Sequence, residues 1–195
     1  NIFILFMLEN LRPFLTRILN PIASKININP NIVTIISPFI AALSAYCFGE
    51  HMLILGAVFI LLSGFLDVID GAVARFHSRT SKFGAFLDST MDRIADGIIY
   101  IGIIFGGYCN WFIGVLAIHS ALTISYVKAR AESQGVECNV GVAERAVRMI
   151  ILMIGAVLGY LAGDVYFTYT IIFLVIISYF TVVQRVYHVW RNLDE

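Results

Sequence analysis

Apolar stretches long enough to cross a bilayer are the feature that most limits how this chain can fold. Six stretches have this character, and several exceed the roughly 20 residues that one helical crossing needs. The 195 residues are 59% hydrophobic and their mean hydropathy is +0.87, far more apolar than soluble domains. We therefore expect an all-α integral membrane protein, a bundle of six transmembrane helices in one domain spanning residues 1–195. The expected spans are residues 32–49, 52–75, 84–107, 111–133, 142–162 and 165–189.

A shorter amphipathic segment precedes the first span. Residues 10–20 place five large apolar side chains at helical spacing, with basic and polar side chains between them. This pattern predicts a short helix that lies in the headgroup layer rather than crossing it. An ordinary terminal helix packed on protein is the alternative.

Four aspartates interrupt the apolar pattern at the end of the second span and within the third. A carboxylate at the bilayer centre costs roughly 2.5–3.5 kcal/mol, so four unpaired ones would cost on the order of 10 kcal/mol. Hard divalent cations such as Mg²⁺ take oxygen ligands and are typically held by a few carboxylates plus substrate phosphates. The aspartates therefore predict a metal site that handles phosphate. The order of the defined positions is Asp67, Asp70, Gly71, Ala74, Arg75, Gly84, Asp88 and Asp92.

Helical spacing places these residues on two facing surfaces. Positions i, i+3 and i+7 of the second span share a face, as do residues at every fourth position of the third. Two acidic faces on neighbouring helices can converge on shared metal ions, while small residues leave room for a ligand near the backbone. Asp96 continues the second stripe by one turn, where a structural role beside Arg93 is an alternative to ligation.

Two other interpretations of the acidic stripe remain open from the residues alone. One is a set of structural ion pairs with nearby Arg and Lys residues, although such pairs do not need four acids at these intervals. The other is a cation-transport site, which places the chain in a different functional class. The basic residues concerned are Arg75, Arg79, Lys82 and Arg93.

The distribution of basic residues predicts the orientation. On the six-span interpretation all 13 Lys and Arg fall at the N-terminal segment, at two connections with their adjoining helix ends, and at the C-terminus. The other three connections contain none. The positive-inside rule therefore places both termini and the acidic cluster on the cytoplasmic side of the cell membrane. The formal net charge of +0 hides this asymmetry, and nothing in it indicates a nucleic-acid partner.

The acidic spacing matches, without a departure, the DxxDGxxAR…GxxxDxxxD signature of the CDP-alcohol phosphotransferases. The signature defines eight positions over 26 residues, and the chain resembles this family over nearly its whole length. The resemblance implies six transmembrane helices around a cytoplasm-facing polar cavity, usually in a homodimer. It also implies transfer of a phosphatidyl-type group from a CDP-linked lipid to an alcohol, with release of CMP.

Carried over by position, the resemblance assigns roles to individual residues. It implies that Asp67, Asp70 and Asp88 are metal ligands for two Mg²⁺ ions, or Mn²⁺, and that Asp92 is both a ligand and the general base. The same three ligands also belong to the implied CDP-lipid site. For Asn31 an N-cap role is the alternative. The remaining members of the CDP-lipid site are Asn31, Ile32, Val33, Thr34, Gly71, Ala74, Arg75 and Ser81.

A second cluster, of basic residues, concerns the acceptor. Lys and Arg beside a catalytic cavity favour an anionic acceptor, and Arg can bind phosphate with two parallel hydrogen bonds. The positive-inside bias is the alternative explanation for Arg130, Arg145 and Arg191. The pattern SYVKARAE…ER..R…VQR is similar to the phosphatidylinositol-phosphate synthase branch, which includes archaeal enzymes that use CDP-archaeol. That similarity implies an acceptor-phosphate site formed by Lys128, Arg145, Arg148 and Arg185.

The expected reaction therefore joins CDP-diacylglycerol or CDP-archaeol to myo-inositol phosphate. Transfer to glycerol 3-phosphate is the nearest alternative, because that acceptor carries the same kind of anion. One departure bears on the choice, since Ala146 and Val147 stand where the branch often has Pro-Glu.

Overall fold

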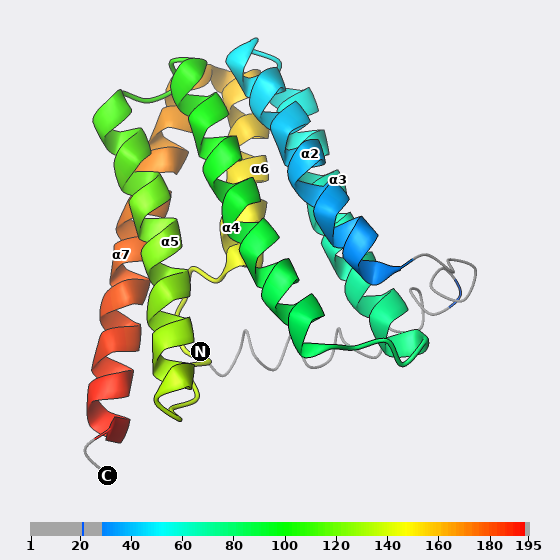
Figure 1. The fold of residues 1–195 in the computed structure, drawn as a ribbon. Helices are drawn as coiled ribbons and strands as arrows, with labels where there is room; N and C mark the ends of the chain where they lie inside the picture. Colours follow the sequence, from blue (N-terminus) through cyan, green and yellow to red (C-terminus); the bar gives the residue numbers. More distant parts are fainter. Residues whose placement is uncertain (1–20, 22–28, 194–195) are drawn as a thin grey trace.

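The computed structural model describes residue 21 and residues 29–193, so the expected interfacial helix at 10–20 lies outside the described residues. Six helices make up this part of the chain, and no strand occurs in it (Figure 1). The expected all-α bundle is confirmed. The helices are α2 Pro30–Gly49, α3 Leu53–Phe76, α4 Lys82–Phe105, α5 Trp111–Ser133, α6 Arg145–Ala162 and α7 Asp164–Leu193.

Side-chain caps define where three of these helices begin. The Asn29 side chain accepts a hydrogen bond from the Asn31 backbone N–H at 3.1 Å, with Pro30 in the first turn of α2. The N-cap of α2 is therefore Asn29, and the alternative role considered for Asn31 is wrong. Ser81 caps α4 by accepting from Gly84 N–H at 2.9 Å, and Asn110 caps α5 by accepting from Ile113 N–H at 2.9 Å.

Two helix ends differ from the expected ranges by more than two residues. Helix α6 begins at Arg145 rather than at 142, because Glu144 has an extended backbone and occupies the N-cap position. Helix α7 continues to Leu193, beyond the expected end at 189. Its last turns carry polar side chains, so apolar content alone did not mark them as helical.

The six helices pack in a closed ring. Following the contacts around the bundle, the order is α2, α3, α6, α7, α5, α4 and back to α2. Helices that follow one another in the sequence run in opposite directions, so the starts of α2, α4 and α6 lie at the same end as the ends of α3, α5 and α7 (Figure 1). The described Lys and Arg residues belong to this end or to the adjoining half of the helices.

Small residues allow the closest helix contacts in the ring. A Cβ added at Gly102 of α4 would overlap the backbone of Ala45 of α2, and one added at Gly155 of α6 would overlap Thr170 of α7. Between α2 and α3, the hydroxyls of Ser37 and Ser63 lie 2.9 Å apart. Such small and hydroxyl-bearing contacts are typical of helices packed within a bilayer.

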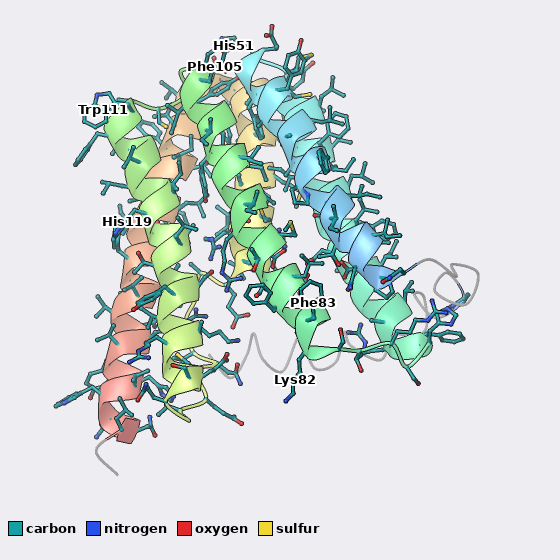
Figure 2. All side chains as sticks on the ribbon, in the orientation of Figure 1. His51, Lys82, Phe83, Phe105, Trp111 and His119 are labelled. Carbon is teal, nitrogen blue, oxygen red and sulfur yellow. The ribbon has the colours of Figure 1, made fainter. Side chains whose placement is uncertain are left out.

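Five of the six helices are long and apolar enough to cross a membrane. Helix α4 is the exception in composition, because its first half contains charged residues that face the polar interior described below. Large apolar side chains are exposed along the outer faces, as a lipid-facing surface requires. Figure 2 shows His51, Phe105 and Trp111 at one end of the bundle, and Lys82 and Phe83 at the opposite end.

Candidate active site

Three of the predicted metal ligands meet between α3 and α4. Asp67, Asp70 and Asp88 each offer a carboxylate oxygen, and these oxygens lie within 4.8 Å of one another. Asp70 is buried, whereas Asp67 and Asp88 are half-buried. Among the described residues, the Asp88 Oδ1 atom is buried and has no hydrogen-bond partner. Three clustered carboxylates with an unsatisfied oxygen suit a hard divalent cation such as Mg²⁺ or Mn²⁺.

Thr34 of α2 fixes one member of this acidic centre. Its hydroxyl lies 2.6 Å from Asp70 Oδ2 and 3.1 Å from the Pro30 carbonyl oxygen, one turn earlier in the same helix. A hydroxyl carries a single proton, so donation to the carboxylate and to the carbonyl are alternatives. The close contact with Asp70 nevertheless ties α2 to the acidic face of α3.

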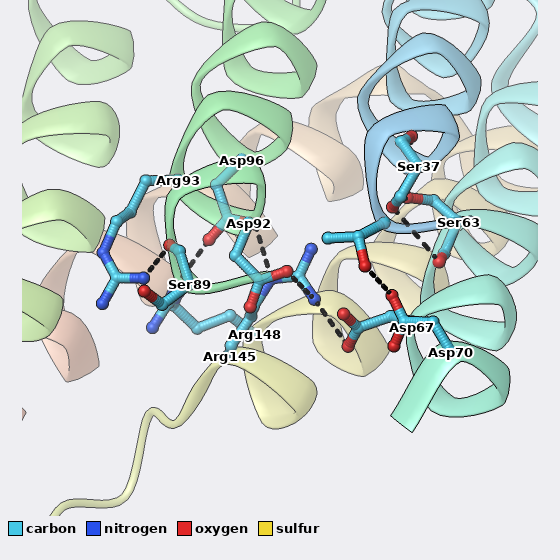
Figure 3. A network of polar contacts seen from close by, with 11 residues as sticks. Ser37, Ser63, Asp67, Asp70, Ser89, Asp92, Arg93, Asp96, Arg145 and Arg148 are labelled. Carbon is cyan, nitrogen blue, oxygen red and sulfur yellow. Dashed lines mark hydrogen bonds and ion pairs between the residues drawn. The ribbon is translucent and has the colours of Figure 1, made fainter. Parts of the chain in front are cut away.

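Asp92 is arranged differently from the other three aspartates. Its Oδ1 atom lies 3.0 Å from Arg145 Nη1, and the same nitrogen lies 3.3 Å from Asp67 Oδ2. Figure 3 shows the Arg145 guanidinium between α3 and α4, in contact with carboxylates from both. Asp92 is therefore not part of the three-carboxylate group; its role as a ligand and general base stays a prediction.

Asp96 connects this centre to two arginines in the first turn of α6. It is 4% exposed and accepts hydrogen bonds from Arg145 Nε at 3.1 Å and from Arg148 Nη2 at 2.8 Å. The structural alternative considered for Asp96 involved Arg93, but the partners are these two arginines of α6. Arg93 instead donates to the backbone carbonyl of Ser89.

A narrow cavity of about 160 Å³ opens between α2, α3 and α4, beside the acidic centre. Most of the predicted CDP-lipid residues line it, whereas Ile32, Val33 and Asp67 do not. Ile32 is exposed on the outer face of α2 and Val33 is buried. We refer to it as the nucleotide cavity, after the CDP-lipid site predicted for the residues that line it: Asn31, Thr34, Asp70, Gly71, Ala74, Arg75, Ser81 and Asp88.

A second cavity of about 450 Å³ lies on the other side of α4, among α4, α5, α6 and α7. All four predicted acceptor-phosphate residues line it, together with Asp88, Asp92 and Asp96. Its volume is within the range of small-molecule pockets. We refer to it as the basic cavity because five cations line it, namely Arg93, Lys128, Arg145, Arg148 and Arg185.

The four predicted acceptor-phosphate residues differ in how strongly the protein already holds them. Arg185 donates to the carbonyls of Val140 at 2.8 Å and Ile124 at 2.7 Å. Arg148 is 1% exposed and donates to Ala143 O at 2.9 Å as well as to Asp96, while its Nε has no partner in the described part of the chain. The Lys128 side chain is 39% exposed and lies 3.2 Å from Asn139 Oδ1.

Some lining residues were not predicted from the sequence to belong to either cavity. Arg79 and Thr80 reach the nucleotide cavity from the connection between α3 and α4, and Glu144 reaches the basic cavity from the start of α6. Loop residues have no helical periodicity that could place them. Asp96 did carry a signal, since it continues the four-residue stripe of α4, but spacing alone did not identify its partners.

Comparison with known proteins identifies the family. The family model described as CDP-alcohol phosphatidyltransferase matches residues 27–186. This range is well over half of the chain. The chain belongs to this family.

Curated relatives extend along almost the whole chain. An archaetidylinositol phosphate synthase of Methanothermobacter thermautotrophicus is 46% identical over 96% of this chain and 96% of its own length. One from Pyrococcus horikoshii is 36% identical over 96% of this chain and 99% of its own length.

A solved structure shows the same fold. The crystal structure of Mycobacterium tuberculosis phosphatidylinositol phosphate synthase with CDP-DAG bound has a TM-score of 0.80 and 30% identity, covering 89% of this chain and 94% of that one. The same enzyme has been solved in complex with manganese and citrate, with a TM-score of 0.80, 30% identity and 88% of each chain covered.

Proposed function

We propose that this membrane protein transfers a lipid phosphate group from a CDP-linked lipid to myo-inositol phosphate, releasing CMP. The observation that carries the proposal is that the two cavities on either side of α4 share lining residues of that helix. Ala85 and Asp88 line both the nucleotide cavity and the basic cavity. A donor on one side and an anionic acceptor on the other would therefore meet at the acidic centre.

On the donor side, small residues and an arginine suit a cytidine diphosphate. Gly71 and Ala74 leave the α3 backbone open to the cavity, and Arg75 supplies a cation beside it. The manganese complex and the CDP-DAG complex of the mycobacterial relative support the same assignment of metal and donor. The donor is a CDP-linked diacylglycerol or archaeol, as the names of the relatives indicate.

The reaction forms one bond and breaks another at phosphorus. The acceptor hydroxyl oxygen attacks the lipid-side phosphorus of the donor, the bond from this phosphorus to the oxygen of CMP breaks, and CMP leaves. Asp92 takes the proton of the attacking hydroxyl. Asp67, Asp70, Asp88 and Asp92 would hold divalent ions, which would supply charge stabilisation for the donor diphosphate.

On the acceptor side, the basic cavity binds the phosphate of inositol phosphate. Lys128 is exposed enough to reorient toward a ligand, and Arg148 presents an Nε atom that has no partner among the described residues. The guanidinium of Arg185 is held in place by two backbone carbonyls. An anionic acceptor suits this concentration of cations better than an uncharged alcohol.

The orientation and the assembly also belong to this proposal. The described Lys and Arg residues gather at the end of the bundle that holds the two cavities. By the positive-inside rule, this supports a site on the cytoplasmic side of the cell membrane. A homodimer is what the family resemblance implies, and it stays a prediction.

A CMP-release assay tests the function. The purified full chain in detergent or liposomes is incubated with Mg²⁺, with CDP-archaeol or CDP-diacylglycerol, and with myo-inositol phosphate, glycerol 3-phosphate or no acceptor. We expect CMP release that depends on inositol phosphate and stops with EDTA. CMP release that depends on glycerol 3-phosphate instead would show that glycerol 3-phosphate is the acceptor. Absence of CMP with every donor, together with metal uptake into liposomes, would favour cation transport.

A further inference from the structure

Arg145 lies where the positive charge of a metal ion is expected. Its Nη1 atom lies 3.3 Å from Asp67 Oδ2 on α3 and 3.0 Å from Asp92 Oδ1 on α4. The side chain is 22% exposed, so this ion pair is only partly screened by solvent. The guanidinium thus joins one ligand of the three-carboxylate centre to the aspartate that stands outside it (Figure 3).

This position excludes a second cation on the same two oxygens. A Mg²⁺ ion binds carboxylate oxygens at about 2.0–2.1 Å and requires close to octahedral geometry. An ion that used Asp92 together with Asp67 would therefore occupy the space of Arg145 Nη1, and the two positive charges would repel each other strongly. The three-carboxylate centre of Asp67, Asp70 and Asp88 retains carboxylate oxygens that do not contact Arg145.

The Arg145 side chain has a second anchor that does not involve a predicted ligand. Its Nε atom donates to Asp96 Oδ1 at 3.1 Å. Asp96 is itself held by Arg148 Nη2 at 2.8 Å, and both residues are buried. Because the guanidinium is one planar group, its Nη1 atom can leave Asp67 and Asp92 when the whole group tilts about the Nε–H bond to Asp96.

We propose that Arg145 is a tethered counter-ion that exchanges with the second divalent ion of the centre. It neutralises Asp67 and Asp92 before that ion binds, and yields them when the ion arrives, with Asp96 as its pivot. Arg145 also lines the basic cavity, so its released group becomes available to the acceptor phosphate. This inference rests on the two-ion chemistry of the proposed function and names the residue that controls the second ion.

Metal binding without nucleotide tests the exchange. Mn²⁺ is titrated into the purified full chain and followed by electron paramagnetic resonance and calorimetry. We expect the wild type to bind one ion tightly and a second ion weakly. Arg145→Gln should tighten the second step at least about tenfold, because the competing charge is gone. An unchanged or weaker second step in a folded Arg145→Gln protein would overturn the proposal.

Arg93→Gln is the matched control. It removes the same charge from the residue next to Asp92, but Arg93 contacts a backbone carbonyl rather than a carboxylate. We expect less than about a twofold change in the second Mn²⁺ step, because no exchange is involved. If Arg93→Gln tightens the second Mn²⁺ step as much as Arg145→Gln does, the effect comes from the general electrostatic field of the site. That result would overturn the proposed exchange.

A structure of the wild-type protein with saturating Mn²⁺ gives a second test that needs no variant. Arg145 should then contact Asp96 and no longer contact Asp67 or Asp92. Two bound ions with Arg145 still within hydrogen-bond distance of both aspartates would overturn the proposal. Neither test uses donor or acceptor, so a failed CMP assay and a failed exchange are separate results.

Discussion

The two cavities on either side of α4 are built by opposite means. The nucleotide cavity is formed mainly by small and hydroxyl-bearing residues, so the space left beside the backbone sets its shape. The basic cavity is formed by long charged side chains that already bond to one another and to backbone carbonyls. In the nucleotide cavity, a small residue contributes by leaving space for a ligand beside the backbone. In the basic cavity, the position of a charged side chain depends on its bonding partners elsewhere in the bundle.

Asp92 lies at the boundary between these regions, and its removal should have the largest effect. Asp92→Asn should lower CMP release by about 10³-fold, because the acceptor hydroxyl loses its proton acceptor. Binding of a CDP-lipid should persist, since Asp92 does not line the nucleotide cavity. The rate is measured by CMP release and the binding by calorimetry. Asp164→Asn makes the same chemical change at the opposite end of the bundle and should keep the wild-type rate; retained turnover in Asp92→Asn would refute the assignment.

Arg148 tests whether the basic cavity is a structural unit as well as a binding site. Arg148→Met should lower the free energy of unfolding by about 3–5 kcal/mol, because the buried Asp96 loses a charged partner. Thermal or denaturant unfolding in detergent measures this loss. The double variant Asp96→Leu with Arg148→Met removes both charges and should regain part of the stability. A single variant as stable as the wild type would contradict the structural role.

Lys128 should show the contrasting behaviour within the same cavity. Because its side chain is 39% exposed, Lys128→Ala should leave the unfolding temperature unchanged. Loss of a charged hydrogen bond to phosphate corresponds to about a tenfold or greater rise in KM for inositol phosphate. The KM for the CDP-lipid should stay constant. Arg130→Ala, two residues later and outside the lining of this cavity, is the matched control. Equal effects of the two variants would assign the change to general surface charge.

The sequence predicted the membrane fold well because its main signal is local. Length and apolar content place each span, and only the start of α6 and the end of α7 differ from the expected ranges by more than two residues. The aspartates were placed by the same kind of periodicity. Asp67, Asp70 and Asp88 converge because two antiparallel helices carry them on adjoining faces.

The partners of long side chains could not be predicted in this way. Arg145 of α6 contacts carboxylates on α3 and α4 that are 78 and 49 residues away in the sequence. Such contacts depend on which helices are neighbours in the ring, and spacing within one helix contains no information about that. The family resemblance places all of residues 31–34 at the donor site, although Ile32 is exposed on the outer face of α2.

The smallest expected effect, at Gly71, tests whether open space alone shapes the nucleotide cavity. A Cβ added there would lie 3.2 Å from Arg75 Nη1, so Gly71→Ala should displace the end of that side chain. We expect the KM for the CDP-lipid to rise about threefold and the KM for the acceptor to change little. A change of about threefold corresponds to less free energy than the loss of one hydrogen bond. Gly64→Ala in the same helix is the control, since nothing lies within 4 Å of its added Cβ. Both changes should stabilise the helix by up to about 1 kcal/mol, because alanine has the higher helix propensity. If the donor KM rises in neither variant, Arg75 can move away without loss and does not set the shape of the cavity.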